Sequence, residues 1–144
     1  AEAMPFPGNS KRGASMRKVV RSADIPKPRG VYSPAIVADG FVFVSGQGAV
    51  NPKTNELELG DIRSEARQTL RNIQAILEAA GSSLRDVVRL GVFLADMKDF
   101  EVMNEVFREF FPEDPPARST VGAQLPKIKI EIDAIARVPN RRKR

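Results

Sequence analysis

The stretch IKIEIDAIA, residues 128–136, decides how this 144-residue chain folds. Its side chains alternate: Ile128, Ile130, Ile132 and Ala134 share one face, and Lys129, Glu131, Asp133 and Ile135 share the other. A period of two predicts a β-strand with one face in the core. The opposite face carries two carboxylates, and the residues alone leave two interpretations open: an exposed polar surface, or a carboxylate that points into a cleft and orients a water molecule.

The stretch before it, PPARSTV at 115–121, places Arg118 between a proline-stiffened loop and a β-favouring run. A guanidinium on such rigid backbone can bind a carboxylate through two parallel hydrogen bonds. The plainer alternative is a solvated arginine in a surface salt bridge.

Two helices are predicted further towards the N-terminus. Asp61 can cap a helix that runs to about Ala80, where Gly81 ends it, and Asp96 can cap a second helix to about Phe111. Their apolar residues recur at spacings of three and four: Ile62, Ala66, Leu70, Ile73 and Leu77 in the first, and Phe100, Met103, Phe107 and Phe110 in the second.

Strands are expected at 31–38, 41–46, 87–95 and around 119–123, with Asp39-Gly40 as a hairpin turn. The order β-β-α-β-α-β-β predicts an α+β sandwich, a mixed sheet with both helices on one face. The strand 41–46 and Ile135 add apolar side chains to the other face, so we expect this face to mediate oligomerisation.

The net charge of +5 is unevenly distributed. Residues 23–136 hold 13 basic and 17 acidic side chains, so the excess of positive charge lies in the two ends of the chain. We expect a flexible basic extension at 1–22, ordered structure from about Val31 within a single domain at 23–138, and a basic tail at 139–144. No secretory or membrane-spanning run is visible, which favours a cytoplasmic protein, or an organellar one if residues 1–22 are the remnant of a transit peptide.

Histidine and cysteine are absent, which excludes Ser-His-Asp and Cys-His catalysis and the usual zinc sites. Acid–base chemistry must then come from carboxylates, tyrosine, arginine, lysine or water. Three further polar residues could contribute to a site or to the structure. The Ser45 hydroxyl could bind backbone or contact a substrate, and Tyr32 could be an ordinary packing residue or line a pocket. Asn104 lies within the apolar stripe of the second helix and is expected to be structural.

Taken in order, the segments GVYS (30–33), FVFVSGQ (41–47), NPKT (51–54), RQTLRNIQAILEAAGSS (67–83), VFLADMKDFEVMNEVFREFF (92–111), PPARSTV (115–121), LPK (125–127) and IEIDAIA (130–136) resemble the RidA/YjgF family of enamine/imine deaminases. The resemblance covers about Ile25 to Ala136. It implies a chorismate mutase-like α+β fold, a homotrimer with clefts between subunits, and hydrolysis of 2-imino or enamino acids to 2-keto acids and ammonia without cofactor or metal.

By the same resemblance, Arg118 would bind the substrate carboxylate and Glu131 would hold or activate the attacking water. Tyr32 and Ser45 would line the pocket, and Gly46 would allow close backbone approach. Thr120 would contact the substrate at a position where many members have cysteine, and Asn104 would be structural.

The sequence departs from the family at Val31, where proline is common, and at Pro34, where glutamine is common. The segment from Arg118 to Glu131 is also shorter than usual, so that Asp133 competes with Glu131 by distance along the chain. Two other functions stay open: a non-catalytic, regulatory trimer that binds small carboxylates, and an RNA-directed endoribonuclease or translation inhibitor acting through the basic tails.

Overall fold

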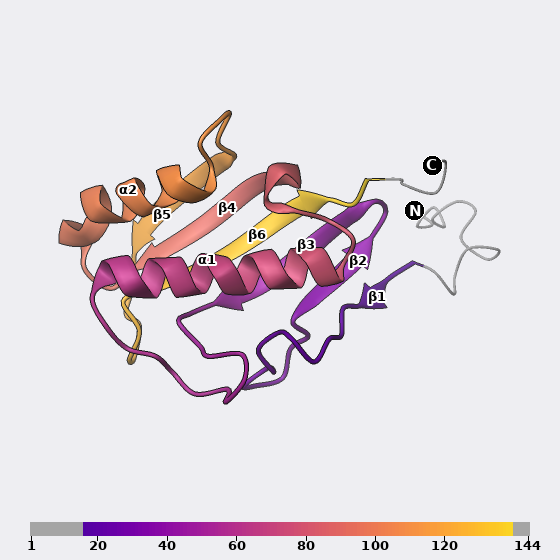
Figure 1. The fold of residues 1–144 in the computed structure, drawn as a ribbon, viewed down its shortest axis with the longest axis horizontal. Coiled ribbons are helices and arrows are strands. Elements are labelled where there is room, and N and C mark those ends of the chain that lie inside the picture. The colour runs from indigo at the N-terminus through magenta and orange to yellow at the C-terminus, as the bar shows by residue number, and fades with distance from the viewer. Residues whose placement is uncertain (1–15, 140–144) are drawn as a thin grey trace, which may run out of the picture.

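The computed structural model describes residues 16–139 as one mixed sheet and two helices (Figure 1). The elements are β1 (Lys18–Val19), β2 (Ala35–Ala38), β3 (Phe41–Gln47), α1 (Ile62–Ala79), η2 (Leu84–Asp86), β4 (Val87–Leu94), η3 (Met97–Asp99), α2 (Phe100–Phe110), β5 (Ala117–Gly122) and β6 (Ile130–Arg137). The predicted α+β class and both helices are confirmed.

The strands follow the order β1-β2-β3-β6-β4-β5 across the sheet. Strand β6 lies between β3 and β4 and is antiparallel to both, while β4 and β5 run parallel. The parallel pair follows from connectivity, because α2 separates β4 from β5 and carries the chain back to the same end of the sheet.

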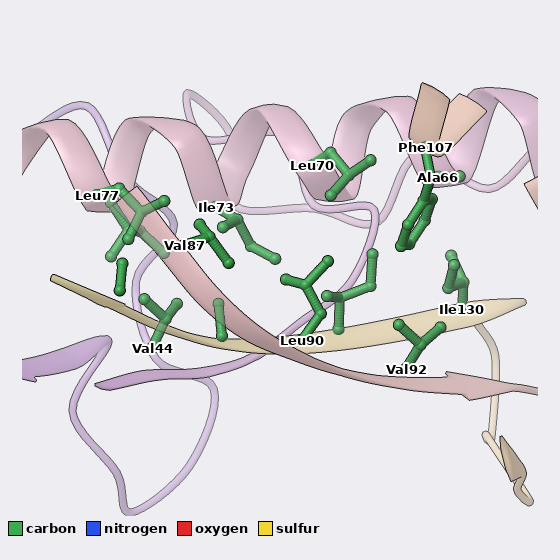
Figure 2. Close-up of a cluster of buried hydrophobic side chains, with 14 of the residues drawn as sticks. Val44, Ala66, Leu70, Ile73, Leu77, Val87, Leu90, Val92, Phe107 and Ile130 are labelled. Carbon is green, nitrogen blue, oxygen red and sulfur yellow. The ribbon is translucent and has the colours of Figure 1, made fainter. Parts of the chain in front are cut away.

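Both helices pack on one face of the sheet. On this face every inward residue of β6 is buried: Ile130, Ile132, Ala134 and Ala136. Figure 2 shows Leu70, Ile73 and Leu77 of α1 pointing towards the strands. Full burial of one such aliphatic side chain contributes about 1.5–3 kcal/mol, so this layer is the main source of stability.

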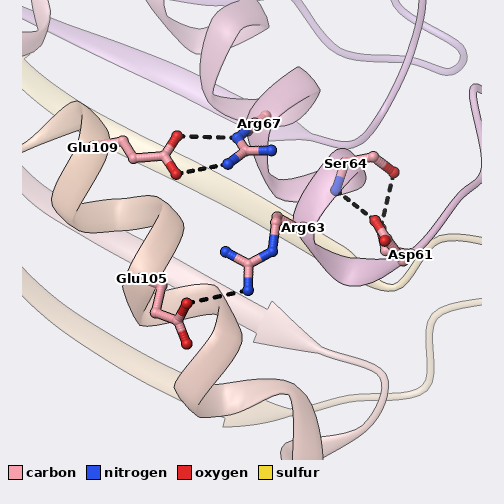
Figure 3. A network of polar contacts seen from close by, with 6 residues as sticks. All are labelled: Asp61, Arg63, Ser64, Arg67, Glu105 and Glu109. Carbon is pink, nitrogen blue, oxygen red and sulfur yellow. Dashed lines mark hydrogen bonds and ion pairs between the residues drawn. The ribbon is translucent and has the colours of Figure 1, made fainter.

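Helix α1 begins as predicted at Asp61, whose carboxylate accepts the N–H of Ser64 at 2.8 Å. This hydrogen bond lowers the pKa of Asp61 below its usual value. On the same end of the helix, Arg67 forms two hydrogen bonds with Glu109 of α2, at 3.0 and 2.7 Å, and Arg63 pairs with Glu105 (Figure 3). These partly exposed pairs set the relative orientation of the helices more than they add stability.

Order begins earlier than expected. The prediction that structure starts near Val31 is wrong, because β1 forms an antiparallel ladder with β2 and Val20 is buried beside it. The boundary at residue 22 is therefore too late, since residues 18–20 belong to the sheet. The rest of the expected extension, residues 1–15, and residues 140–144 of the expected tail lie outside the described residues.

Neither helix within residues 16–139 combines the length and apolar character needed to cross a bilayer. In the same range, no group of three acidic, histidine or cysteine side chains gathers in a way that could hold a metal ion.

A fully buried carboxylate, Glu65 of α1, joins three segments. Its Oε1 accepts the backbone N–H of Lys129 at 2.8 Å, and its Oε2 accepts that of Gly60 at 3.1 Å. The Lys129 ammonium lies 3.6 Å from Oε2. Glu65 thereby fixes the chain just before β6, two residues from Glu131.

We expect Glu65→Ala to lower the free energy of unfolding by about 2–4 kcal/mol, because two backbone N–H groups lose their acceptor inside the protein. Urea unfolding measures the change. Glu78→Ala is the matched control, an exposed glutamate of the same helix, and should stay within about 0.5 kcal/mol of the wild type. Equal losses in the two variants would contradict the role given to Glu65.

Candidate functional site

The two helices leave the second face of the sheet uncovered within the described residues. Phe41 and Phe43 of β3 are 38% and 44% exposed there, and Ile135 of β6 is partly exposed beside Phe43 in the strand register. Exposed aromatic side chains grouped on one sheet face are typical of an interaction surface.

Glu131 and Asp133 project onto this uncovered face, each beside a glycine. The N–H of Gly91 donates to Asp133 Oδ1 at 3.1 Å. Gly46 lies so close to Glu131 that an added Cβ would come within 2.7 Å of Oε2. Asp133 is therefore bound to backbone, whereas the Glu131 carboxylate accepts no hydrogen bond from any residue in 16–139.

Partial burial raises the pKa of Glu131 above its ordinary value of 4.5, and the neighbouring charge of Asp133 raises it further. A carboxyl group whose pKa is raised accepts a proton more readily than an ordinary surface glutamate. Such a group is a stronger general base towards a bound water than an ordinary surface glutamate.

A hollow of about 130 Å³ opens beside Glu131. It is lined by three of the sequence-predicted residues, Tyr32, Gly46 and Glu131. The hydroxyl of Tyr32 accepts the backbone N–H of Arg29 at 3.0 Å, which holds the ring against the loop that precedes it. The structure thus brings Glu131 to two residues that lie 85 and 99 positions earlier in the chain.

Ser45 is placed differently. Its hydroxyl donates to the backbone carbonyl of Ser33 at 2.6 Å and does not line the hollow. This is the backbone-bonded arrangement that the sequence left as the alternative to a substrate contact.

Arg118 lies on the opposite, helix-covered side of the sheet. In the parallel register it stands beside Leu90, and Thr120 stands beside Val92; both of these neighbours are buried under the helices. The Arg118 side chain therefore does not reach the face that carries Glu131, and one copy of the chain does not bring the two residues together.

The residues that contact the Arg118 side chain come from helix α2. Its Nη1 donates to Asn104 Oδ1 at 2.9 Å, and its guanidinium carbon lies 5.3 Å from the ring centre of Phe107 and 5.6 Å from that of Phe100. Burial lowers the pKa of Arg118, which remains a cation at neutral pH. No carboxylate within residues 16–139 forms an ion pair with it.

Thr120 follows Arg118 on the same side of β5. Its Oγ1 is buried and has no hydrogen-bond partner among the described residues. Because a buried hydroxyl without a partner costs free energy, this atom is available to a ligand or to another chain.

Sequence reasoning missed Lys27 and Arg29, which line the hollow with Glu131. The available signal was the alternation of proline and cation in PKPRG, residues 26–30. It also assigned Asn104 only a structural role, although Asn104 holds the guanidinium itself.

Comparison with known proteins identifies the family of this chain. The family model described as Endoribonuclease L-PSP matches residues 22–138. A RutC family protein from Pyrococcus horikoshii is 52% identical over 123 residues, which covers 84% of this chain and 98% of the relative. The human protein named 2-iminobutanoate/2-iminopropanoate deaminase is 39% identical over 123 residues, which cover 84% of this chain and 90% of the human protein.

Two solved structures of related proteins have the same fold as this chain. RidA from the Antarctic bacterium Psychrobacter sp. PAMC 21119 superposes with a TM-score of 0.80 at 40% identity, covering 83% of this chain and 98% of that one. TdcF from E. coli, solved with bound serine, has a TM-score of 0.78 at 38% identity over the same shares of the two chains. The chain belongs to the RidA/YjgF/RutC family, which the Endoribonuclease L-PSP model describes.

Proposed function

We propose that this protein hydrolyses 2-imino acids, and their enamine tautomers, to 2-keto acids and ammonia at a site shared by two copies of the chain. One observation carries the proposal: Arg118 and Glu131 are both without an ionic partner among residues 16–139, both are held on strands, and they lie on opposite faces of the sheet. The names of the deaminase relatives support the reaction class.

Arg118 is the group that binds the substrate carboxylate. Asn104 occupies one N–H of the guanidinium and the rings of Phe100 and Phe107 support it, so the cation is oriented before substrate arrives. A guanidinium with free N–H groups can bind a carboxylate through two parallel hydrogen bonds. Fixing the carboxylate in this way orients the adjacent imine carbon.

Glu131 is the group that handles protons. A water held by its carboxylate adds to the imine carbon, and Glu131 takes a proton from that water. That proton passes to the nitrogen, which gives a carbon bearing a hydroxyl and an amino group. The hydroxyl then gives up its own proton by way of Glu131 to the same nitrogen, the carbon–nitrogen bond breaks, and ammonia leaves as the carbonyl forms. The imine is already electrophilic, so one carboxylate and one water are sufficient, without a cofactor.

The remaining predicted residues shape the site. Tyr32 forms a wall of the hollow, and Gly46 lets backbone approach the ligand where a Cβ would displace the Glu131 carboxylate. Ser45 supports the loop that carries Tyr32 through its bond to Ser33. Thr120 offers its unpartnered hydroxyl on the Arg118 side.

The assembly that we propose is a homotrimer. The uncovered face, with Phe41, Phe43 and Glu131, packs against the edge of the next copy, where β5 carries Arg118. This arrangement buries the exposed aromatic side chains and completes three equivalent clefts.

A second function, the binding of small carboxylates without turnover, has one observation in its favour: a relative of 38% identity was solved with bound serine. Both functions need Arg118, and only hydrolysis needs the proton transfer of Glu131. Substitution of Glu131 therefore separates them.

We expect Arg118→Ala to lower kcat/KM by about 100-fold, since the charged hydrogen bonds to the carboxylate are lost, and Glu131→Gln to lower kcat by 100-fold or more. An amino-acid oxidase acting on L-alanine supplies 2-iminopropanoate, and semicarbazide traps whatever imine survives. Arg71→Ala, an exposed arginine of α1, is the control and should behave as the wild type. Wild-type turnover in Arg118→Ala would remove this residue from the site, and a fully active Glu131→Gln would remove the proposed base.

A shared site makes a second test available. We expect co-expressed Arg118→Ala and Glu131→Gln chains to regain activity that neither has alone, because mixed assemblies contain clefts with Arg118 from one copy and Glu131 from another. Activity of the purified mixed assembly is the measurement, with each variant alone as its control. No recovery in an assembly shown to contain both chains would place the two residues in separate sites.

The pH profile tests the state of Glu131. Since the residue acts as a carboxylate, kcat/KM should fall on acidification through a pKa above 4.5. Asp133→Asn removes a neighbouring negative charge that favours the protonated form of Glu131. The acidic limb of the profile, where kcat/KM falls, should therefore move to lower pH by roughly a few tenths of a unit. Asp39→Asn, at an exposed turn, should leave the limb in place. A limb that Asp133→Asn moves to higher pH, or leaves unchanged, would contradict the assignment.

A further inference from the structure

One wall of the hollow beside Glu131 is a short cationic loop. Residues 26–29 read Pro-Lys-Pro-Arg, and all four line the hollow. The proposed reaction uses neither Lys27 nor Arg29. Glu131 is the one acidic residue that lines the same space.

This loop is held in place by Asn55 and by its own prolines. Asn55 Oδ1 accepts the backbone N–H of Lys27 at 2.9 Å, and Asn55 O accepts a hydrogen bond from Arg29 Nη1 at 3.1 Å. The backbone N–H of Arg29 is bound in turn by the Tyr32 hydroxyl. Two side chains that usually move freely are thus attached to fixed backbone at the rim of a cavity.

Neither cation has an ionic partner. No carboxylate in the described part of the chain lies within ion-pair distance of Lys27 or Arg29, whereas Arg63 and Arg67 of α1 both form such pairs. Two neighbouring positive charges without an anion favour the binding of one.

We infer that Lys27 and Arg29 bind a second anionic group of the substrate, and that the preferred substrates are 2-imino dicarboxylates. The inference rests on the proposed function, because it assigns the α-carboxylate to Arg118 of another copy and the imine carbon to Glu131. The distal carboxylate then reaches the cationic loop. A hollow of about 130 Å³ suits a short-chain dicarboxylate and is well below the size of sites for larger ligands.

The test compares two imines made in the same way. An L-glutamate oxidase supplies 2-iminoglutarate, an L-amino-acid oxidase supplies 2-iminopropanoate from L-alanine, and semicarbazide traps both. The wild type should have the higher kcat/KM for 2-iminoglutarate. Lys27→Gln and Arg29→Gln should each lower this value by about tenfold and change that for 2-iminopropanoate by less than twofold.

Two further variants separate charge from structure. Arg29→Lys keeps the positive charge and should retain most of the preference, although it loses the geometry of the bond to Asn55. Lys98→Gln, an exposed lysine outside the hollow, should leave both substrates unaffected. Calorimetric binding of 2-oxoglutarate and 2-oxobutanoate gives a readout that does not depend on turnover, and 2-oxoglutarate should bind more tightly to the wild type than to Lys27→Gln.

The outcomes distinguish the two proposals. Normal turnover of 2-iminopropanoate with no loss on 2-iminoglutarate in either Gln variant would overturn the dicarboxylate inference and leave the deaminase intact. No turnover of either imine would overturn the deaminase. In that case, equal binding of 2-oxoglutarate by the wild type and by Lys27→Gln would overturn the dicarboxylate site as well.

Discussion

The structure depends on one constraint, the alternation of side chains along the central strand β6. Its neighbours β3 and β4 hold it by antiparallel ladders on both edges, so no residue of β6 can change face without a shift of the whole register. The isoleucines and alanines on one side complete the core under α1, and the other side presents Glu131 and Asp133. Stability and chemistry are therefore specified by alternate residues of the same eight-residue strand.

The charges of the molecule fall into two groups with different physical roles. Those on the helices are paired: Arg67 with Glu109 and Arg63 with Glu105, at partly exposed positions where the pairs orient more than they stabilise. Those near the proposed site, Arg118, Glu131, Lys27 and Arg29, have no ionic partner within residues 16–139. Arg118 and Glu131 are partly buried, where an unpaired charge costs free energy and indicates a ligand, whereas Lys27 and Arg29 are exposed and line the same hollow as Glu131.

The elements with a strong internal pattern could be predicted from the sequence. The stripe from Ile62 to Leu77 and the alternation at 128–136 each contain enough repeats to specify type and face. Strand β1 could not be predicted, because two residues have no period of their own and depend on pairing with β2. The side of the sheet on which Arg118 lies could not be predicted either, because strand β5, ARSTVG, has no clear alternation of apolar and polar residues. Only the parallel register of β5 with β4 shows that the Arg118 side chain points towards α2. The site residues were thus identifiable by type, but their separation onto two faces required the strand pairing.

The position of β6 also bears on how the molecule acquires its fold. Among the described strands the last in sequence is the central one in space, inserted between β3 and β4, which lie about 40 to 90 positions earlier. Before β6 is added, the sheet can form only as two separate parts, β1 to β3 and β4 with β5. During synthesis on the ribosome, the facing edges of β3 and β4 therefore stay unpaired until β6 emerges. Such distant pairing is intrinsically slow and leaves strand edges free for longer, so the assembly of the sheet is the step most exposed to mispairing.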